Sequence, residues 1–195
     1  MSIANRIRVE HVAVLSHDWY LLKKTTFSFL RSDGSWQRQS RETYDRGNGA
    51  TILLYEPEHR TVILVRQLRY PAFVNGHDDL LIEAPAGLLD EAAPEVRIRA
   101  EVEEETGIRV REVRQIFDAF MSPGSVTERL HFFVGAYHTS DRISQGGGNQ
   151  EEGEDIAVLE VGIEEALAMI ESGAIRDGKT IMLLQYAALN LFSTR

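Results

Sequence analysis

Three glutamates in one short stretch, Glu101, Glu104 and Glu105, place the tightest constraint on how this chain can fold. Residues three and four positions apart are neighbours on a helix, so the three carboxylates are expected to share one helical face. Like charges at this spacing destabilise a helix by roughly 0.2–0.5 kcal/mol per pair, and a bound cation removes that penalty. Hard divalent ions with oxygen ligands, Mg²⁺ above all, suit such a cluster. The spacing therefore predicts a helix that holds a metal ion.

The residues on either side favour this interpretation over the simpler one, in which a run of glutamates is only a solvated helix face. Before the glutamates, Ala84-Pro85-Ala86-Gly87 offers small residues whose backbone carbonyls can approach an ion closely. Pro94 suits the first turn of a helix, and Gly107 suits the left-handed position that ends one. The loop and the helix are therefore expected to share the ion.

The whole stretch from Ala86 to Gly107, AGLLDEAAPEVRIRAEVEEETG, resembles the Nudix box. This box is the signature of hydrolases that cleave nucleoside diphosphates linked to another group. Its two essential glutamate positions fall on Glu101 and Glu105, and its third falls on Glu104. The resemblance therefore gives the glutamate cluster a chemical role.

The front half of the box is shifted by one residue. Its first glycine position falls on Ala86, with Gly87 one residue later, and its early glutamate position falls on Ala92. Ala100 stands where the box has an arginine. We expect Arg99 to take over that arginine's role by bracing a carboxylate or the loop that carries Gly87.

The resemblance implies a set of metal ligands and catalytic groups. The metal is Mg²⁺, with Mn²⁺ as a substitute, and the expected ligands are the Ala86 carbonyl, Glu101, Glu104, Glu105 and a glutamate of the apolar-free loop SQGGGNQEEGED (residues 144–155). Matching that loop backwards from Asp155 points to Glu154, with Glu152 as the runner-up. The metal would assist hydrolysis of a diphosphate, and Glu154 or a box glutamate would take the proton of the attacking water. Glu101, Glu105 and Glu154 are therefore the candidate catalytic residues.

Similarity along most of the chain suggests the substrate. The segments DRGNGATILLY, RQLR, AGLLD, MSPGSVTE and the GGG loop with EDI resemble the GDP-mannose branch of the Nudix family, whose products are GMP and mannose 1-phosphate. ADP-ribose, or another ADP-sugar, is the alternative substrate. The resemblance places Arg69, Gly87, Glu128 and Lys179 near the ligand, and Lys179 also follows Asp177-Gly178 at a helix start, which suits an anion.

The pattern of apolar residues predicts an α+β fold in two parts. Residues 1–45 read as a small antiparallel β-sheet, with strands at 11–15, 19–30 and 36–44 and a hairpin turn at Ser32-Asp33-Gly34. We expect residues 46–195 to form the Nudix domain that the resemblance implies. The apolar pattern of this part predicts strands at 49–55, 60–69, 79–84, 110–120, 130–138 and 156–161 and two further helices at 163–172 and 179–192. The resemblance implies an α/β/α sandwich in which helices flank a mixed sheet.

In similar enzymes that form homodimers, the N-terminal sheet is exchanged between subunits. Trp19 would then stack on a base or pack at the interface, and Arg41 and Glu42 would reach the partner's ligand. The alternative is a structural meander with Trp19 in its core.

Composition excludes several other classes. A formal net charge of −9 argues against non-specific nucleic-acid binding, and the absence of a long apolar run argues against a signal peptide or a membrane span. The chain has no cysteine, which excludes disulfides and thiolate chemistry and fits a cytoplasmic location. The remaining alternative is a domain that senses a nucleotide sugar without cleaving it.

Overall fold

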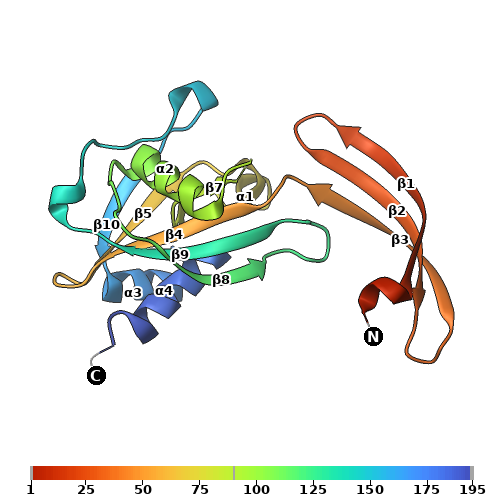
Figure 1. The fold of residues 1–195 in the computed structure, drawn as a ribbon. Helices are drawn as coiled ribbons and strands as arrows, with labels where there is room; N and C mark the ends of the chain where they lie inside the picture. The colour runs from red at the N-terminus through yellow and green to blue at the C-terminus, as the bar shows by residue number, and fades with distance from the viewer. Residues whose placement is uncertain (1, 90, 194–195) are drawn as a thin grey trace. The chain divides into compact units, whose positions relative to one another are not determined.

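The structure is a computed structural model that describes residues 2–89 and 91–193. The chain divides into two compact units (Figure 1). The N-terminal unit comprises the described residues up to 48 together with residues 120–129, and the second unit comprises residues 49–119 with the described residues from 130 onward. Each unit is considered by itself below.

The N-terminal unit is a three-stranded antiparallel sheet, as the sequence predicts. A short 3₁₀ helix, Ile3–Arg6, precedes strands β1 (Ile7–His17), β2 (Leu21–Leu30) and β3 (Trp36–Asp45), which pair in the order β1-β2-β3. The hairpin between β2 and β3 turns at Gly34, whose φ of 84° is a left-handed value that favours glycine. Asp33 stabilises this turn by accepting a hydrogen bond of 2.9 Å from the Ser35 backbone N–H.

Register shifts in β1 gather its apolar side chains on one face of this sheet. A bulge between Val9 and His11 pairs Val9 with Phe27 and Val12 with Thr25. Without the extra residue, the odd spacing from Val9 to Val12 would send these two side chains to opposite faces, because side chains alternate along a strand. The register places seven apolar side chains on one face, which we call the apolar face: Ile7, Val9, Val12, Val14, Leu21, Phe27 and Phe29.

No residue of the N-terminal unit is buried among those that the structure describes. The side chains of this face are open to solvent: Val9, Val12 and Val14 are 63%, 50% and 59% exposed. Trp19 is 82% exposed, so it does not lie in the core of a meander. A three-stranded sheet with an uncovered apolar face lacks the burial that normally stabilises such a sheet.

The second unit contains a mixed seven-stranded sheet. Its main path runs β10-β5-β4-β9-β8, with β6 added to β5 and β7 added to β4. The strands are β4 (Gly49–Glu56), β5 (Thr61–Gln67), β6 (Leu81–Glu83), β7 (Ala86–Leu88), β8 (Arg114–Phe120), β9 (Arg129–Ala136) and β10 (Ala157–Gly162). Strands β4 and β9 pair in parallel, whereas β4 and β5 pair antiparallel. The predicted mixed sheet is therefore confirmed.

Helices cover both faces of the sheet. They are α1 (Tyr70–Val74), α2 (Pro94–Thr106), α3 (Ile163–Glu171) and α4 (Gly178–Asn190), with short 3₁₀ turns at Thr139–Asp141 and Gln150–Glu152. Figure 1 shows α2 on one face and α3 and α4 on the other. The sequence predicted α2, α3 and α4 but not α1 or the three-residue strand β7. No helix in the described part of the chain has the length and apolarity needed to cross a membrane.

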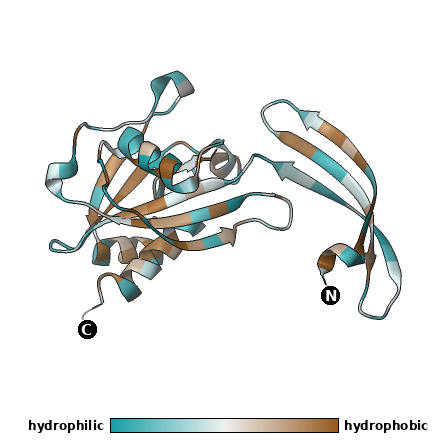
Figure 2. Ribbon diagram, in the orientation of Figure 1, coloured by the Kyte–Doolittle hydropathy of each residue, from teal (hydrophilic) through white to brown (hydrophobic). Residues whose placement is uncertain are grey.

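The core of this unit fixes α2 against the sheet. Ile98 and Val102, one turn apart on α2, are fully buried and belong to the same apolar cluster as Ile52 and Ile63 of the central strands. Figure 2 shows these central strands to be predominantly hydrophobic. As predicted, Pro94 lies in the first turn of α2, and Gly107 ends the helix with a left-handed φ of 70°. The helix that carries the glutamates is therefore held at both ends and along one side.

Candidate functional site

The packing of α2 divides its three glutamates. Glu101 and Glu105 are buried, at 7% and 1% exposed, because they lie beside Ile98 and Val102 on the sheet-facing side. Glu104 is exposed to solvent. The structure therefore sets two carboxylates apart from the third, although all three are close in sequence.

Glu105 lies in an excess of negative charge. Burial raises the pKa of its carboxyl well above the ordinary value for a glutamate, and the neighbouring carboxylates of Glu101, Glu83 and Glu154 raise this pKa further, against an opposing effect of Arg69. Its Oε2 atom is buried and has no hydrogen-bond partner. A buried oxygen without a donor is costly, and a bound cation relieves both that cost and the repulsion.

Gly87 allows the loop before α2 to reach Glu101. A Cβ atom at position 87 would lie 2.0 Å from Glu101 Oε1, so only glycine permits this approach. The loop is itself fixed, because Ala86, Gly87 and Leu88 form β7 and pair with β4. The backbone of Ala86–Leu88 and the Glu101 carboxylate are thus adjacent, as the shared-ion hypothesis requires.

Arg97, and not Arg99, braces the loop and the carboxylate. Arg97 Nη2 lies 2.5 Å from Glu101 Oε1, and Arg97 Nε donates a hydrogen bond of 3.0 Å to the Leu88 carbonyl. Arg99 instead pairs with Glu95 at 2.8 Å and donates to the Arg111 carbonyl at 2.5 Å. The expectation for Arg99 is wrong because Arg97, at i−4, lies below Glu101 on the helix, whereas a residue two positions away faces elsewhere.

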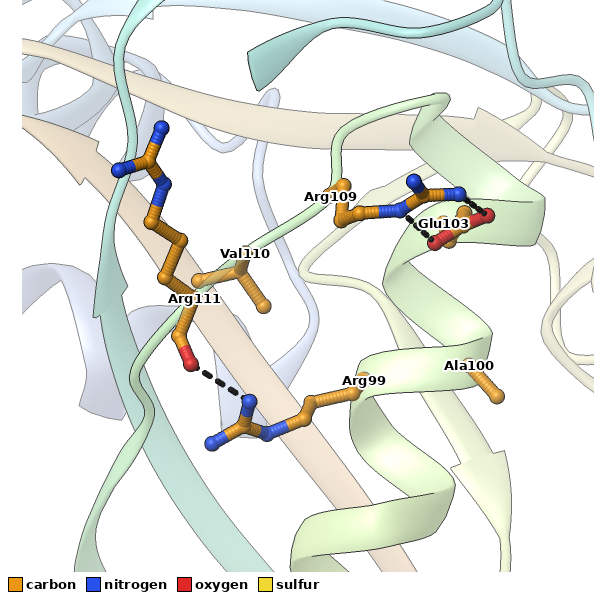
Figure 3. A pocket seen from close by; sticks show the side chains of 6 residues that line it. All are labelled: Arg99, Ala100, Glu103, Arg109, Val110 and Arg111. Carbon is orange, nitrogen blue, oxygen red and sulfur yellow. Dashed lines mark hydrogen bonds and ion pairs between the residues drawn. The ribbon is translucent and has the colours of Figure 1, made fainter.

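A cavity beside Arg99 is separate from the carboxylate site. It measures about 360 Å³ and is lined by Arg99, Ala100, Glu103, Arg109, Val110 and Arg111. Figure 3 shows Arg109 paired with Glu103 through two contacts, each 2.9 Å, and Arg99 directed at the Arg111 carbonyl. None of the predicted catalytic, metal or substrate-binding residues lines this cavity. The guanidinium groups of Arg99 and Arg109 are already engaged, by the Arg111 carbonyl and by Glu103.

The glycine-rich loop binds to the C-terminal end of α2 and so carries Glu154 towards Glu105. Gly147 N–H donates to the Glu105 carbonyl at 3.0 Å, and Gly148 N–H donates to the Glu104 carbonyl at 3.3 Å. Glu154 Oε2 accepts a hydrogen bond of 2.9 Å from the Asn149 N–H. The predicted mobile loop therefore has a defined attachment to α2. The Glu152 side chain lies outside the part of the chain that is described.

A second group of charges lies beside the carboxylates, and the sequence analysis missed its central residue. Glu83, at the end of β6, is 2% exposed. Its Oε1 lies 2.6 Å from Arg69 Nε, and its Oε2 binds Lys179 Nζ. Both cations were predicted to contact the ligand. No sequence motif singled out Glu83, because its partners lie 14 and 96 positions away.

The other predicted ligand residues belong to the N-terminal unit. Glu128 forms an ion pair with Arg46 at 3.4 Å. Arg41 donates to the Ser40 carbonyl and to Gln39, at 2.8 and 2.9 Å, and Glu42 and Trp19 are exposed. These four residues lie in the unit that comprises residues up to 48 and 120–129.

The carboxylate site fits a divalent cation in its chemistry. In the described residues, no three acidic or histidine side chains already converge in the arrangement of a metal site. The unpartnered Glu105 oxygen and the close approach of Gly87 are nevertheless the features expected of a site that gains a cation.

The chain is similar to two family models, to curated relatives and to a solved structure. A family model described as the NUDIX domain matches residues 45–184, and one described as the GDP-mannose pyrophosphatase NudK N-terminal domain matches residues 6–44. The GDP-mannose pyrophosphatase of Pectobacterium atrosepticum is 52% identical over 188 residues, which is 96% of each chain. That of Salmonella typhimurium is 54% identical over 174 residues, 89% of this chain and 90% of the relative. The crystal structure of an ADP compounds hydrolase has a TM-score of 0.72 at 14% identity, covering 95% of this chain and 94% of the other, and this likeness concerns the fold.

Replacement of Arg97 is expected to destabilise the protein more than replacement of Arg99. Arg97→Met removes the partner of a buried carboxylate and should lower the free energy of unfolding by about 1–3 kcal/mol. Arg99→Met breaks an exposed pair on the same helix and should cost less than about 1 kcal/mol. Urea unfolding without divalent ions measures both, and equal losses would contradict the role assigned to Arg97.

The raised pKa of Glu105 predicts how the metal-free protein responds to pH. Since the folded state binds this proton more tightly than the unfolded state, stability falls as pH rises from 4.5 through the raised pKa. Glu105→Gln should therefore stabilise the metal-free protein at pH 8, because it removes a buried negative charge that other carboxylates repel. The gain should shrink towards pH 5. Unfolding in EDTA across this range measures it, and a loss of stability at pH 8 would refute the electrostatic assignment.

Proposed function

The chain belongs to the Nudix family of hydrolases, and from this membership we propose that it hydrolyses the diphosphate bond of GDP-mannose to give GMP and mannose 1-phosphate. The observation that carries the substrate is the 52% identity to a GDP-mannose pyrophosphatase over 96% of both chains. The match of residues 6–44 to the N-terminal domain of such an enzyme supports the same choice. ADP-ribose is the second candidate, because the box and the turn MSPGSVTE also resemble the ADP-ribose branch of the family.

The Nudix family typically depends on a divalent metal ion, and we assign Mg²⁺, with Mn²⁺ as a substitute, to the site beside α2. The Ala86 carbonyl, Glu101, Glu105 and Glu154 would hold it, and Glu104, being exposed, would contribute from the solvent side. When bound, the ion polarises the phosphoryl oxygens and neutralises charge on the leaving phosphate. The buried carboxylates supply the negative charge that makes a cation favourable at this point.

The chain's own groups would bind the diphosphate and move the proton. Arg69 and Lys179 supply cationic donors for the phosphates, and the glycine backbone at Gly87 lets a ligand approach the loop closely. Glu154, tethered through Asn149 beside the end of α2, would accept the proton of the attacking water at its carboxylate. The cytoplasmic location expected from the cysteine-free sequence remains part of this proposal.

Turnover should depend on Glu105 and on Mg²⁺. Glu105→Gln keeps the shape of the side chain but removes the charge, so kcat for GDP-mannose should fall by on the order of 100-fold or more while the fold survives. Glu103→Gln is the matched control, because Glu103 lies on the same helix but pairs with Arg109. Phosphate-coupled assays of GDP-mannose, ADP-ribose and ADP-glucose, with Mg²⁺ and with EDTA, measure both effects.

The outcomes of this assay separate the candidate functions. Faster cleavage of GDP-mannose than of the ADP-sugars supports the proposed substrate, and the reverse order favours the ADP-ribose alternative. Tight binding of GDP-mannose without cleavage would make the protein a nucleotide-sugar sensor. Normal turnover by Glu105→Gln would refute the metal assignment.

We extend the proposal to a homodimer formed through the N-terminal sheet. The apolar face of this sheet is uncovered, and no side chain among the described residues of its unit is buried. The first 48 residues carry eight basic and five acidic side chains, within a chain of 21 basic and 30 acidic ones. The acidic excess of each chain therefore lies in residues 49–195, and this part of a second copy attracts the basic sheet. In such a dimer Trp19, Arg41, Glu42 and Glu128 would contribute to ligand binding.

A charge on the apolar face should prevent this dimer. Val12→Glu places a carboxylate on that face, and dissociation into monomers is expected because burying an unpaired charge is costly. His11→Glu is the matched control, because His11 is the neighbouring residue and points to the opposite face. Analytical ultracentrifugation measures the mass of each variant, and a monomeric wild-type protein would disprove the dimer.

A further inference from the structure

Glu83 binds two cations at once. Its two carboxylate oxygens divide between Arg69, at 2.6 Å, and Lys179, and its side chain is only 3% exposed. Lys179 is also bound by Asp177 at 2.9 Å and is itself only 12% exposed. Four charged groups thus meet with two charges of each sign, and three of them, Glu83, Lys179 and Asp177, are largely shielded from solvent.

This cluster joins three elements of the fold that are distant in sequence. Arg69 follows β5, Glu83 ends β6, and Lys179 lies in the first turn of α4. Thr180 completes the connection, because its hydroxyl accepts a hydrogen bond of 2.7 Å from the Ala84 N–H and donates one of 2.5 Å to Asp177. The positions of the two cations therefore depend on β6 and on the start of α4.

The same cluster lies next to the carboxylates assigned to the metal. The negative charge of Glu83 and the positive charge of Arg69 both act on Glu105, in opposite directions. Without Glu83, Arg69 and Lys179 would repel each other and would no longer share a common anchor. Glu83 thus fixes the position of the two cations and lowers the net charge of the cluster that contains them.

We propose that Glu83 is a positioning residue that holds Arg69 and Lys179 together as one wall of the diphosphate site. The inference rests on the proposed function, since it takes these two cations to be phosphate ligands. Glu83 orients them for the transition state and offsets one of their two charges. It therefore weakens binding of the ground-state diphosphate while it favours the reaction.

This role predicts an unusual kinetic signature for Glu83→Gln. Both kcat and KM for GDP-mannose should fall, kcat by on the order of tenfold, because the cations lose their orientation but gain net positive charge. Isothermal titration of GDP in EDTA should show binding tighter than wild type by about threefold or more, since a negative charge has left the site. A residue with only a structural role would not tighten GDP binding.

Two further variants complete the test. Glu83→Asp keeps the charge but shortens the side chain, so kcat should fall without tighter GDP binding, and this variant replaces Glu83→Gln if the latter does not fold. Glu103→Gln controls for loss of a paired carboxylate and should leave both measurements unchanged.

Each outcome decides the inference. Unchanged kcat in folded Glu83→Gln and Glu83→Asp, or GDP binding that is unchanged or weaker in Glu83→Gln, would overturn it. If the wild-type enzyme does not cleave GDP-mannose, the proposed function fails, and the titration with GDP still shows whether Glu83 controls the charge of an anion site.

Discussion

The site depends on one packing contact, that of α2 with the central strands of the sheet. Ile98 and Val102 are completely buried in this contact, and they carry Glu101 and Glu105 with them into the interior. Two carboxylates are thereby removed from water at a distance where each raises the energy of the other's charged form. The apolar contact thus keeps two mutually repelling carboxylates buried, and a bound cation would reduce that repulsion.

The surrounding groups respond to this buried charge. Arg97 balances Glu101, Gly87 brings a backbone segment against the same carboxylate, and the glycine-rich loop fastens Glu154 to the end of α2. Glu83 and Arg69 also act on Glu105, and Glu83 joins Arg69 to Lys179. The acidic centre therefore lies next to a cluster that contains two cationic side chains, Arg69 and Lys179, and this arrangement suits a metal ion together with a diphosphate.

The two units of the chain differ in how they are stabilised. The second unit has a continuous apolar core between α2 and the sheet, so it can position charged groups against a rigid background. The N-terminal sheet has no buried side chain in its described residues, and bulges in β1 keep its apolar residues on one face. A sheet with an exposed apolar face needs a partner to bury that face, and this is why we propose that it forms a dimer.

The sequence by itself determined the features that depend on local spacing. The start and end of α2, most of the strands, the close approach of Gly87 and the pairing of Glu101 with Glu105 all follow from residue types a few positions apart. Tertiary structure alone decided which arginine braces Glu101, which glutamate faces solvent, and that Glu83 joins Arg69 to Lys179. These outcomes depend on which helix face packs against the sheet and on contacts across as many as 96 residues, and no local spacing encodes such contacts.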